Sequence, residues 1–280
     1  MKSIPIDGAG RVLEQKLAAL AALLKRMEPF IVAFSGGVDS TFLLAAAKQA
    51  APGRVLAVTV SSAFVPRSEI QLAEKTAAIL KVKHMVIKAD VFAVPLLAGN
   101  PPDRCFHCKK AVFSKILDAG RAKGFDTLLH AVNLDDLGDY RPGLEAAREL
   151  GVFSPLVEAG FTKTDIREAS RLMGLETWDK PSQSCLATRI PYNVTITDTE
   201  LRRIERAEAF LHDLGFDQVR VRVQDTAARI EVLPDLIGRL TAAENRGKIT
   251  QKLKALGFRV VSVDMEGYAT GKMNDEILSG

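Results

Sequence analysis

The sequence predicts an α/β fold, a doubly wound parallel sheet followed by a small C-terminal α+β domain. Short β-branched apolar runs alternate with helical patterns up to Pro191, and a different order of elements follows. The chain has 280 residues, 47% of them hydrophobic and 26% charged, which suits one mid-sized domain plus a small one. We expect a first domain over residues 1–194 and a second over 195–280.

The elements of the first domain follow from the period of their apolar residues. Apolar residues three and four apart predict amphipathic helices, and short β-branched runs predict strands buried on both faces. Strand–helix alternation at this spacing predicts right-handed crossovers. We expect helices over 10–27, 40–49, 68–80, 109–123, 145–150 and 162–173, and strands over 30–34, 55–60, 84–88 and 127–131.

The second domain has a different pattern, which predicts an αββαβ order. Thr197 or Asp198 is placed to cap an amphipathic helix, and two alternating runs flank Gln224-Asp225-Thr226 as in a hairpin. The predicted elements are a helix over 198–214, hairpin strands over 218–223 and 228–233, a helix over 234–256, a strand over 258–263 and a mobile tail over 265–280.

Composition excludes several classes of protein. Lys and Arg total 38 against 34 Asp and Glu, and this net charge of +4 does not call for a nucleic-acid partner. No apolar stretch is long enough to span a membrane, and the N-terminus does not resemble a signal peptide. The 3 cysteines are too few for a disulfide framework, so we expect a cytoplasmic protein.

The segment Ser35-Gly36-Gly37-Val38-Asp39-Ser40 lies between the first predicted strand and a helix. Two glycines let backbone amides approach an anion, and the helix N-terminus behind them favours negative charge. Ser35 and Ser40 add hydroxyl donors, and Asp39 is a candidate ligand for Mg²⁺. The segment lacks the lysine of a Walker motif. A phosphate loop is therefore expected, the alternative being a glycine turn with a Ser or Asp helix cap.

This hexapeptide resembles the pyrophosphate loop (PP-loop) of the N-type ATP pyrophosphatases. The resemblance implies an adenine nucleotide α-hydrolase-like fold and cleavage of ATP to AMP and pyrophosphate. It covers the chain up to about Pro191 and leaves the substrate open. In such folds the run Asn133-Leu134-Asp135-Asp136 lies at the carboxyl edge of the sheet. There Asp135 and Asp136 either hold a metal ion or face the substrate, or they belong to a solvated acidic loop or a helix cap.

Two of the three cysteines lie in Asp103-Arg104-Cys105-Phe106-His107-Cys108-Lys109-Lys110, among basic residues and ahead of a predicted helix. Such surroundings favour thiolate. By itself this Cys-x-x-Cys is compatible with a redox pair, half a zinc site or part of an iron–sulfur site. A site that adds His107 as a ligand remains possible, although His107 lies between the two thiols.

Cys185 lies on a segment framed by Pro181 and Pro191, which should be neither helix nor interior strand. Irregular backbone with Lys180 and Arg189 nearby favours a reactive thiol on a loop. The alternative is a buried structural cysteine.

These segments together resemble the LarE family of ATP-dependent sulfur transferases, over nearly the whole chain. The resemblance rests on the phosphate loop, the Asp-Arg-Cys-x-x-Cys-Lys run, Asp139-Tyr140-Arg141-Pro142-Gly143, the Cys185 loop and Arg220-Val221-Arg222. It implies that the protein uses ATP to adenylate the carboxylates of pyridinium-3,5-biscarboxylic acid mononucleotide. Sulfur then replaces AMP to give thiocarboxylates for a nickel-pincer cofactor.

Two subtypes of the family differ in their source of sulfur. In one, a cysteine at the Cys185 position gives up its own sulfur and becomes dehydroalanine. In the other, three cysteines hold a four-iron four-sulfur (4Fe–4S) cluster that carries an extra sulfide. The presence of Cys105, Cys108 and Cys185 favours the cluster, because three thiolates leave one iron open to an external sulfide. We expect the three thiols to converge beside the phosphate loop.

Arg220 and Arg222 lie two residues apart on a predicted strand and so point to one face, near Arg229 in sequence. Their guanidinium groups suit a phosphate or carboxylate, although a solvated face is equally compatible. With the family resemblance, Arg189, Arg220 and Arg222 are expected to bind the substrate phosphate. Catalytic roles are expected for Cys185 and Asp39, and Mg²⁺ binding for Asp39 and Asp136.

Two other classes of function remain open from the sequence. One is a different PP-loop enzyme, either an amide-forming synthetase, which would not need Cys185, or a tRNA thiolase, which should carry a more basic RNA-binding face. The other is a protein that binds ATP without turnover. We also expect a homo-oligomer, and we expect neither a nucleic acid nor a membrane as a partner. An external source of sulfide is compatible with the sequence, which leaves the origin of the sulfide open.

Overall fold

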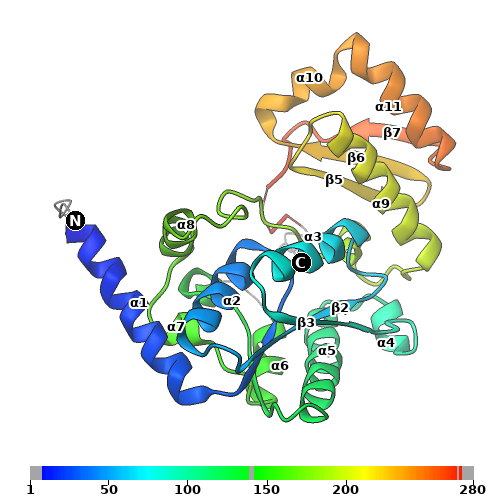
Figure 1. Cartoon of the computed structure of the whole chain (residues 1–280). Coiled ribbons are helices and arrows are strands. Elements are labelled where there is room, and N and C mark those ends of the chain that lie inside the picture. The colour runs from blue at the N-terminus through cyan, green and yellow to red at the C-terminus, as the bar shows by residue number, and fades with distance from the viewer. Residues whose placement is uncertain (1–7, 139–141, 270, 273–280) are drawn as a thin grey trace. The chain divides into compact units, whose positions relative to one another are not determined.

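The computed structural model describes residues 8–138, 142–269 and 271–272 in two compact units (Figure 1). The first unit comprises Met1–Ser62, Arg67–Ala89 and Cys105–Ser182. The second comprises Ala63–Pro66, Asp90–Arg104 and Gln183–Gly280. It therefore takes in more of the chain than the C-terminal domain predicted over 195–280. The residues Asp139, Tyr140 and Arg141 of the family-like motif lie outside the described residues.

The first unit contains a parallel sheet of four strands in the order β3-β2-β1-β4. This arrangement confirms the predicted α/β class. Its elements are α1 (Gly8–Met27), β1 (Phe30–Ala33), α2 (Val38–Ala50), β2 (Val55–Ser61), α3 (Arg67–Ile79), β3 (Lys83–Lys88), α5 (Arg104–Arg121), β4 (Thr127–Leu129), the 3₁₀ helix η1 (Leu134–Gly138), α6 (Pro142–Glu149), α7 (Pro155–Glu158) and α8 (Lys163–Leu172).

Helices cover both faces of this sheet, as the term doubly wound requires (Figure 1). Alternate residues of a strand point to opposite faces. Phe30 and Val32 of β1 accordingly pack in one apolar core, with side chains of α1, α2, α3 and α8. Ile31 packs in the other core, with side chains of α5 and α6. The central strand β1 is thus buried on both faces, and the loop after it lies at the carboxyl edge of the sheet.

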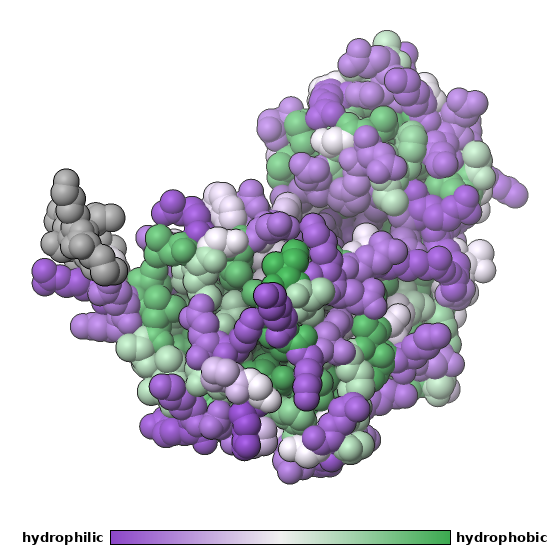
Figure 2. All heavy atoms as spheres, viewed as in Figure 1, coloured by the Kyte–Doolittle hydropathy of each residue, from purple (hydrophilic) through white to green (hydrophobic). Residues whose placement is uncertain are grey.

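The second unit contains a sheet of three strands in the order β5-β6-β7. The strands β5 and β6 form the predicted antiparallel hairpin, and β7 returns parallel to β6. In Figure 2, hydrophilic side chains cover most of the visible face of this unit. Its elements are α4 (Pro95–Ala98), η2 (Leu186–Arg189), α9 (Asp198–Asp213), β5 (Val219–Gln224), β6 (Ala227–Val232), η3 (Pro234–Leu236), α10 (Ile237–Thr241), α11 (Ala243–Ala255) and β7 (Val260–Val263).

Two of the predicted helices are wrong in extent. The helix predicted from residue 109 begins at Arg104, so the Cys-x-x-Cys lies inside α5 rather than ahead of it. The helix start is marked by the amide of Arg104, which donates to the carbonyl of Pro101 at 2.9 Å. The sequence did not reveal this start because the first turns of α5 are polar and do not show the apolar period of a helix. The helix predicted over 234–256 is broken at Ala242, where the backbone is extended. The amide of Ala242 still donates to the carbonyl of Gly238 at 3.1 Å, and the next helix begins at Ala243.

The beginning of the predicted tail is held by the second unit. The amide of Tyr268 donates to the carbonyl of Val232 at 2.8 Å, and the Nζ of Lys272 lies 2.9 Å from a carboxylate oxygen of Asp264. The prediction of mobility for residues 270 and 273–280 lies outside the described part of the chain. Within the described part, no helix combines the length and the apolar character that crossing a membrane requires.

Candidate functional site

The phosphate loop connects the end of β1 to the start of α2. The Ser40 hydroxyl organises it, because Oγ accepts a hydrogen bond from the Ser35 amide at 3.3 Å and donates to the Gly37 carbonyl at 3.2 Å. The N-cap of α2 is Gly37, and no side chain caps the helix. The helix therefore starts without the Ser or Asp cap that the alternative interpretation required. Its open N-terminus is suited to an anion.

Gly36 needs to be glycine for two reasons. Its φ of +73° lies in the left-handed region, which other residues adopt only at a cost. A Cβ added there would lie 3.1 Å from both the Cα and the N of Ala73 in α3. The loop thus passes against helix backbone, where a side chain has no room.

Asp39 is the acidic group of this loop, and its two carboxylate oxygens differ in their surroundings. Its Oδ2 lies 2.6 Å from the Nζ of Lys163, in an ion pair whose side chains are about a quarter exposed. Its Oδ1 is buried and has no hydrogen-bond partner among the described residues. A free carboxylate oxygen next to an anion-binding helix end fits a Mg²⁺ ligand.

Lys163 is a site residue that the sequence did not reveal. It is the first residue of α8, which Thr162 and Asp165 cap reciprocally, with the Thr162 amide donating to Asp165 Oδ2 at 2.8 Å. The capping pattern Thr-x-x-Asp marks the helix start and is the only local signal available. That Lys163 faces Asp39, 124 residues away, is a result of the tertiary fold.

Asp135 and Asp136 hold backbone in place beside this loop. Asp136 Oδ2 accepts from the amide of Asn133 at 3.0 Å, which closes the turn after β4. Asp135 Oδ2 accepts from the amide of Lys163 at 2.7 Å and so fixes the start of α8. Both contacts agree with the capping alternative. The assignment of Mg²⁺ to Asp136 remains a proposal.

His130, for which the sequence suggested no role, is buried next to β4. Its Nε2 lies 2.5 Å from the Oγ of Ser154. Burial, followed by the charge of Lys109, lowers the pKa of His130 to about 3. His130 is therefore neutral at physiological pH.

Cys105 and Cys108 lie three residues apart on α5 and so on one face of the helix. Both side chains are half-buried, as is that of Cys185, and none of the three forms a disulfide within the described residues. Cys105 and Cys108 belong to the first unit, and Cys185 belongs to the second. Across the described ranges, no three side chains of His, Cys, Asp or Glu are grouped so as to hold a metal ion. The pair on α5 fits two thiolate ligands of a shared group, and the third ligand remains a proposal.

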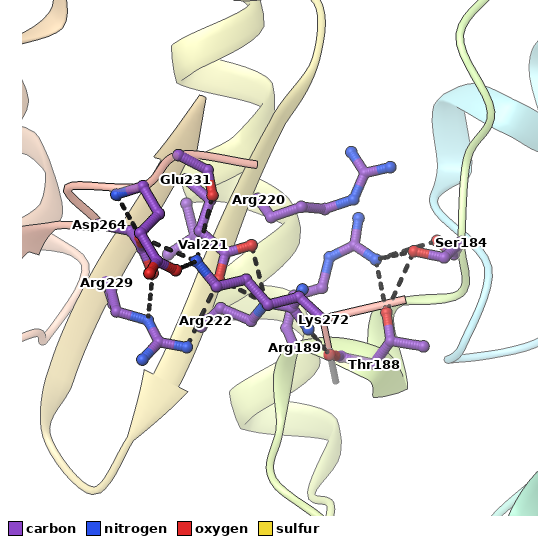
Figure 3. A network of polar contacts seen from close by, with 12 residues as sticks. Ser184, Thr188, Arg189, Arg220, Val221, Arg222, Arg229, Glu231, Asp264 and Lys272 are labelled. Atoms are coloured by element: carbon purple, nitrogen blue, oxygen red, sulfur yellow. Dashed lines mark hydrogen bonds and ion pairs between the residues drawn. The ribbon is translucent and has the colours of Figure 1, made fainter. Parts of the chain in front are cut away.

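The Cys185 loop is held by Arg189, whose side chain is only 1% exposed. The guanidinium pairs with the carboxylate of Glu208 at 2.8 and 2.9 Å. It also donates to the carbonyls of Ser184 at 3.2 Å and Cys185 at 3.1 Å, and to the hydroxyl of Thr188 at 2.8 Å (Figure 3). We predicted a substrate contact for Arg189. Its contacts in the structure hold the loop in place, and the substrate contact stays a prediction.

Arg220 and Arg222 lie on one face of β5, opposite Glu231 and Arg229 of β6. Arg220 is only 1% exposed, and burial, followed by the charge of Arg189, lowers its pKa. Arg222 pairs with Glu231 at 3.0 Å and donates to the carbonyl of Thr188 at 2.6 Å (Figure 3). This face is therefore a paired charge network rather than a solvated surface.

A cavity of about 150 Å³ opens within the second unit beside this network. Its lining includes four cationic side chains, those of Arg189, Arg222, Arg229 and Lys272. The last two also pair with Asp264, at 3.5 and 2.9 Å. Each of these cations has a carboxylate partner, so the cavity offers an anionic group N–H donors rather than an excess of positive charge.

A glycine loop without a Walker lysine, set between a central parallel strand and an open helix N-terminus, defines a PP-loop protein that uses ATP. A family model described as asparagine synthase matches residues 12–97, which contain this loop. Curated relatives extend the similarity to almost the whole chain. The pyridinium-3,5-bisthiocarboxylic acid mononucleotide synthase of Lactiplantibacillus plantarum is 36% identical over 267 residues, 95% of this chain and 96% of that protein. The chain belongs to the family of that synthase, the LarE family.

Two relatives of uncharacterised function show similarity of the same extent. A protein of Synechocystis sp. is 37% identical over 263 residues, 94% of this chain and 98% of its own. A protein of Methanocaldococcus jannaschii is 30% identical over 260 residues, 92% of this chain and 98% of its own. The similarity thus spans both units.

Proposed function

We propose that this protein is an ATP-dependent sulfur transferase that converts the carboxylates of pyridinium-3,5-biscarboxylic acid mononucleotide to thiocarboxylates. The observation that carries the proposal is the phosphate loop with its unpaired Asp39 oxygen, in a chain similar over 95% of its length to the synthase of the dithiocarboxylate. The product would serve nickel-pincer cofactor assembly. We also propose a cytoplasmic location and a homo-oligomer.

The first half-reaction is adenylation of a carboxylate. The loop amides and the N-terminus of α2 bind the β- and γ-phosphates of ATP, and Asp39 would hold the accompanying Mg²⁺. Lys163 pairs with Asp39 and supplies a further positive charge to the phosphates. The substrate carboxylate attacks the α-phosphorus, and pyrophosphate leaves toward the helix end, where its charge is stabilised. Adenylation is needed because a carboxylate oxygen is a very poor leaving group.

The second half-reaction transfers sulfur at Cys185. A nucleophilic sulfur attacks the carbonyl carbon of the mixed anhydride, the new carbon–sulfur bond forms, and AMP leaves with the former carboxylate oxygen. If the sulfur is an external sulfide, the product is the thiocarboxylate. If it is the Cys185 sulfur, the product is a thioester, and loss of the Cα proton then breaks the Cβ–Sγ bond to release the thiocarboxylate and leave dehydroalanine. Arg189 keeps the loop in place through its bonds to Ser184 and Cys185. The substrate phosphate binds in the cationic cavity, where Arg222, with 15% of its side chain exposed, is the better placed of the two β5 arginines to donate.

We propose that Cys105, Cys108 and Cys185 are ligands of a 4Fe–4S cluster. The support is the two thiols on one face of α5 and the number of cysteines in the sequence, since three thiolates leave one iron open. Such a cluster would supply an open iron site for an external sulfide. Anaerobic purification followed by iron and acid-labile sulfide analysis tests this, with about four irons per chain expected.

The test of the proposed function separates the two half-reactions. Cys185→Ala, given ATP and substrate, should release pyrophosphate and form no thiocarboxylate. Formation of thiocarboxylate by this variant would contradict the sulfur role. Cys105→Ala and Cys108→Ala are matched comparisons, because the cluster requires all three thiols whereas sacrificial donation requires only Cys185. Sacrifice would also leave Cys185 lighter by one sulfur after a single turnover.

The other classes of function give different results in the same assay. A protein that holds ATP without turnover would release no pyrophosphate. An amide-forming synthetase would retain product formation in Cys185→Ala. A tRNA thiolase would require tRNA for pyrophosphate release and would bind it in a salt-dependent manner.

A further inference from the structure

Arg104 is a buried cation without an acidic partner in the described part of the chain. Its side chain is only 1% exposed and belongs to the second unit, as does Cys185. One guanidinium nitrogen, NH1, donates to the Asn100 side-chain oxygen and to the Ala187 carbonyl, the latter at 3.3 Å. The other, NH2, lies 4.0 Å from the Sγ of Cys185. A buried charge that nothing compensates is costly, so the neighbouring sulfur is the natural place for negative charge.

Asn100 holds both Arg104 and the segment that follows Cys185. It is fully buried, and its φ of +55° is unusual for a residue other than glycine. Its Nδ2 donates to the carbonyls of Ile190 at 3.1 Å and Pro191 at 2.7 Å. One side-chain amide therefore fixes the guanidinium through its oxygen and the loop through its nitrogen. The position of Arg104 relative to the Cys185 sulfur is thus set by the fold and not by a flexible surface contact.

We propose that Arg104 is a positioning residue for the sulfur donor, which acts by donating to the Cys185 sulfur and compensating its negative charge. The proposal rests on the proposed function, in which that sulfur reacts with the adenylated carboxylate. A thiolate is negatively charged whether it is free or bound to iron, so the contact serves both modes of sulfur supply. The residues proposed to bind ATP, namely the phosphate loop and Lys163, belong to the first unit, and Arg104 is not one of them.

A stability measurement tests the charge compensation without any turnover. In metal-free protein, Cys185→Asp places a carboxylate near Arg104, and Cys185→Asn places a neutral group of the same shape. The Asp variant should melt higher, by about 2 °C or more, because its carboxylate pairs with the guanidinium. In an Arg104→Met background the difference should vanish. Arg104→Gln is the neutral background if Arg104→Met does not fold. An Asp variant no more stable than the Asn variant, or a difference that persists without Arg104, would overturn the proposal.

A kinetic measurement tests the role in sulfur transfer. Arg104→Met should release pyrophosphate with an unchanged KM for ATP but lose most thiocarboxylate formation, and Arg104→Lys should recover part of it because the charge remains. Arg203→Met is the matched control, since Arg203 is another packed guanidinium of the second unit, paired with Glu200 and stacked on Phe258. It should lose stability and keep sulfur transfer.

The outcomes separate this proposal from the proposed function. Wild-type protein that releases no pyrophosphate with the substrate would contradict the proposed function, while the stability comparison would still test Arg104. Sulfur transfer at the wild-type rate in Arg104→Met, or loss of both half-reactions together, would overturn the positioning role.

Discussion

Replacing Gly36 by alanine should damage the phosphate loop more than the backbone angle alone explains. An alanine at a positive φ costs about 1–2 kcal/mol relative to an allowed conformation. At Gly36 its Cβ would also lie 3.1 Å from backbone atoms of Ala73, closer than the usual contact of about 3.5–4.0 Å. Because α3 or the loop must then shift, we expect a further loss of about 1–3 kcal/mol, the usual cost of overpacking.

Gly53 provides the matched control for this substitution. Its φ of +79° is close to the +73° of Gly36, but a Cβ added at Gly53 would meet nothing within 4 Å. Gly53→Ala therefore carries only the cost of the backbone angle. At about 2–4 °C per kcal/mol, Gly36→Ala should melt roughly 2–12 °C below Gly53→Ala.

Pyrophosphate release measures the consequence for ATP use. A displacement of about 1 Å at a reacting group costs on the order of 100-fold in rate, and we expect a loss of this size in Gly36→Ala. Gly53→Ala should keep the wild-type rate. If the two variants melted at the same temperature and Gly36→Ala released pyrophosphate normally, the argument from the close approach to α3 would be wrong.

Three further predictions follow from the first unit. Lys163→Met should lower pyrophosphate release, whereas Lys16→Met, which breaks an ion pair of the same 2.6 Å length and similar exposure, should leave it unchanged; equal losses would contradict the role of Lys163. In Asp39→Asn, added Mg²⁺ should no longer raise the rate of pyrophosphate release, because the amide lacks the charge that binds the metal. Titration with Mg²⁺ measures this. As the pH falls from about 6.5 to 3, the unfolding free energy should fall by up to about 1.4 kcal/mol per pH unit. The reason is that His130 binds a proton in the unfolded chain over this range, whereas in the folded protein its pKa is lowered to about 3. Urea denaturation of His130→Asn should show a shallower fall, and an unchanged slope would refute this account.

Most of the fold of the first unit could be predicted from the sequence. Its strands and helices have strong apolar periods, because β1 is buried on both faces and the helices on one. The phosphate loop could be found for the same local reason, since its glycines, serines and aspartate are consecutive. The beginning of α5 could not be predicted, because the residues around the two cysteines are mostly polar and do not show the apolar period of a helix. Nor could the break at Ala242, because the sequence on its two sides is compatible with one continuous helix.

The sequence alone determined the chemistry that the chain carries, namely a phosphate loop, a pair of thiols in one run, a third thiol on an irregular loop, and the arginines of β5. Only the tertiary structure decided which groups meet. Lys163 reaches Asp39 across 124 residues, and Arg104 reaches Cys185 across 81. Arg189, which appears in the sequence as a free cation, is buried against Glu208. The physical reason is that burial and pairing of charge depend on neighbours distant along the chain, and no local period records them.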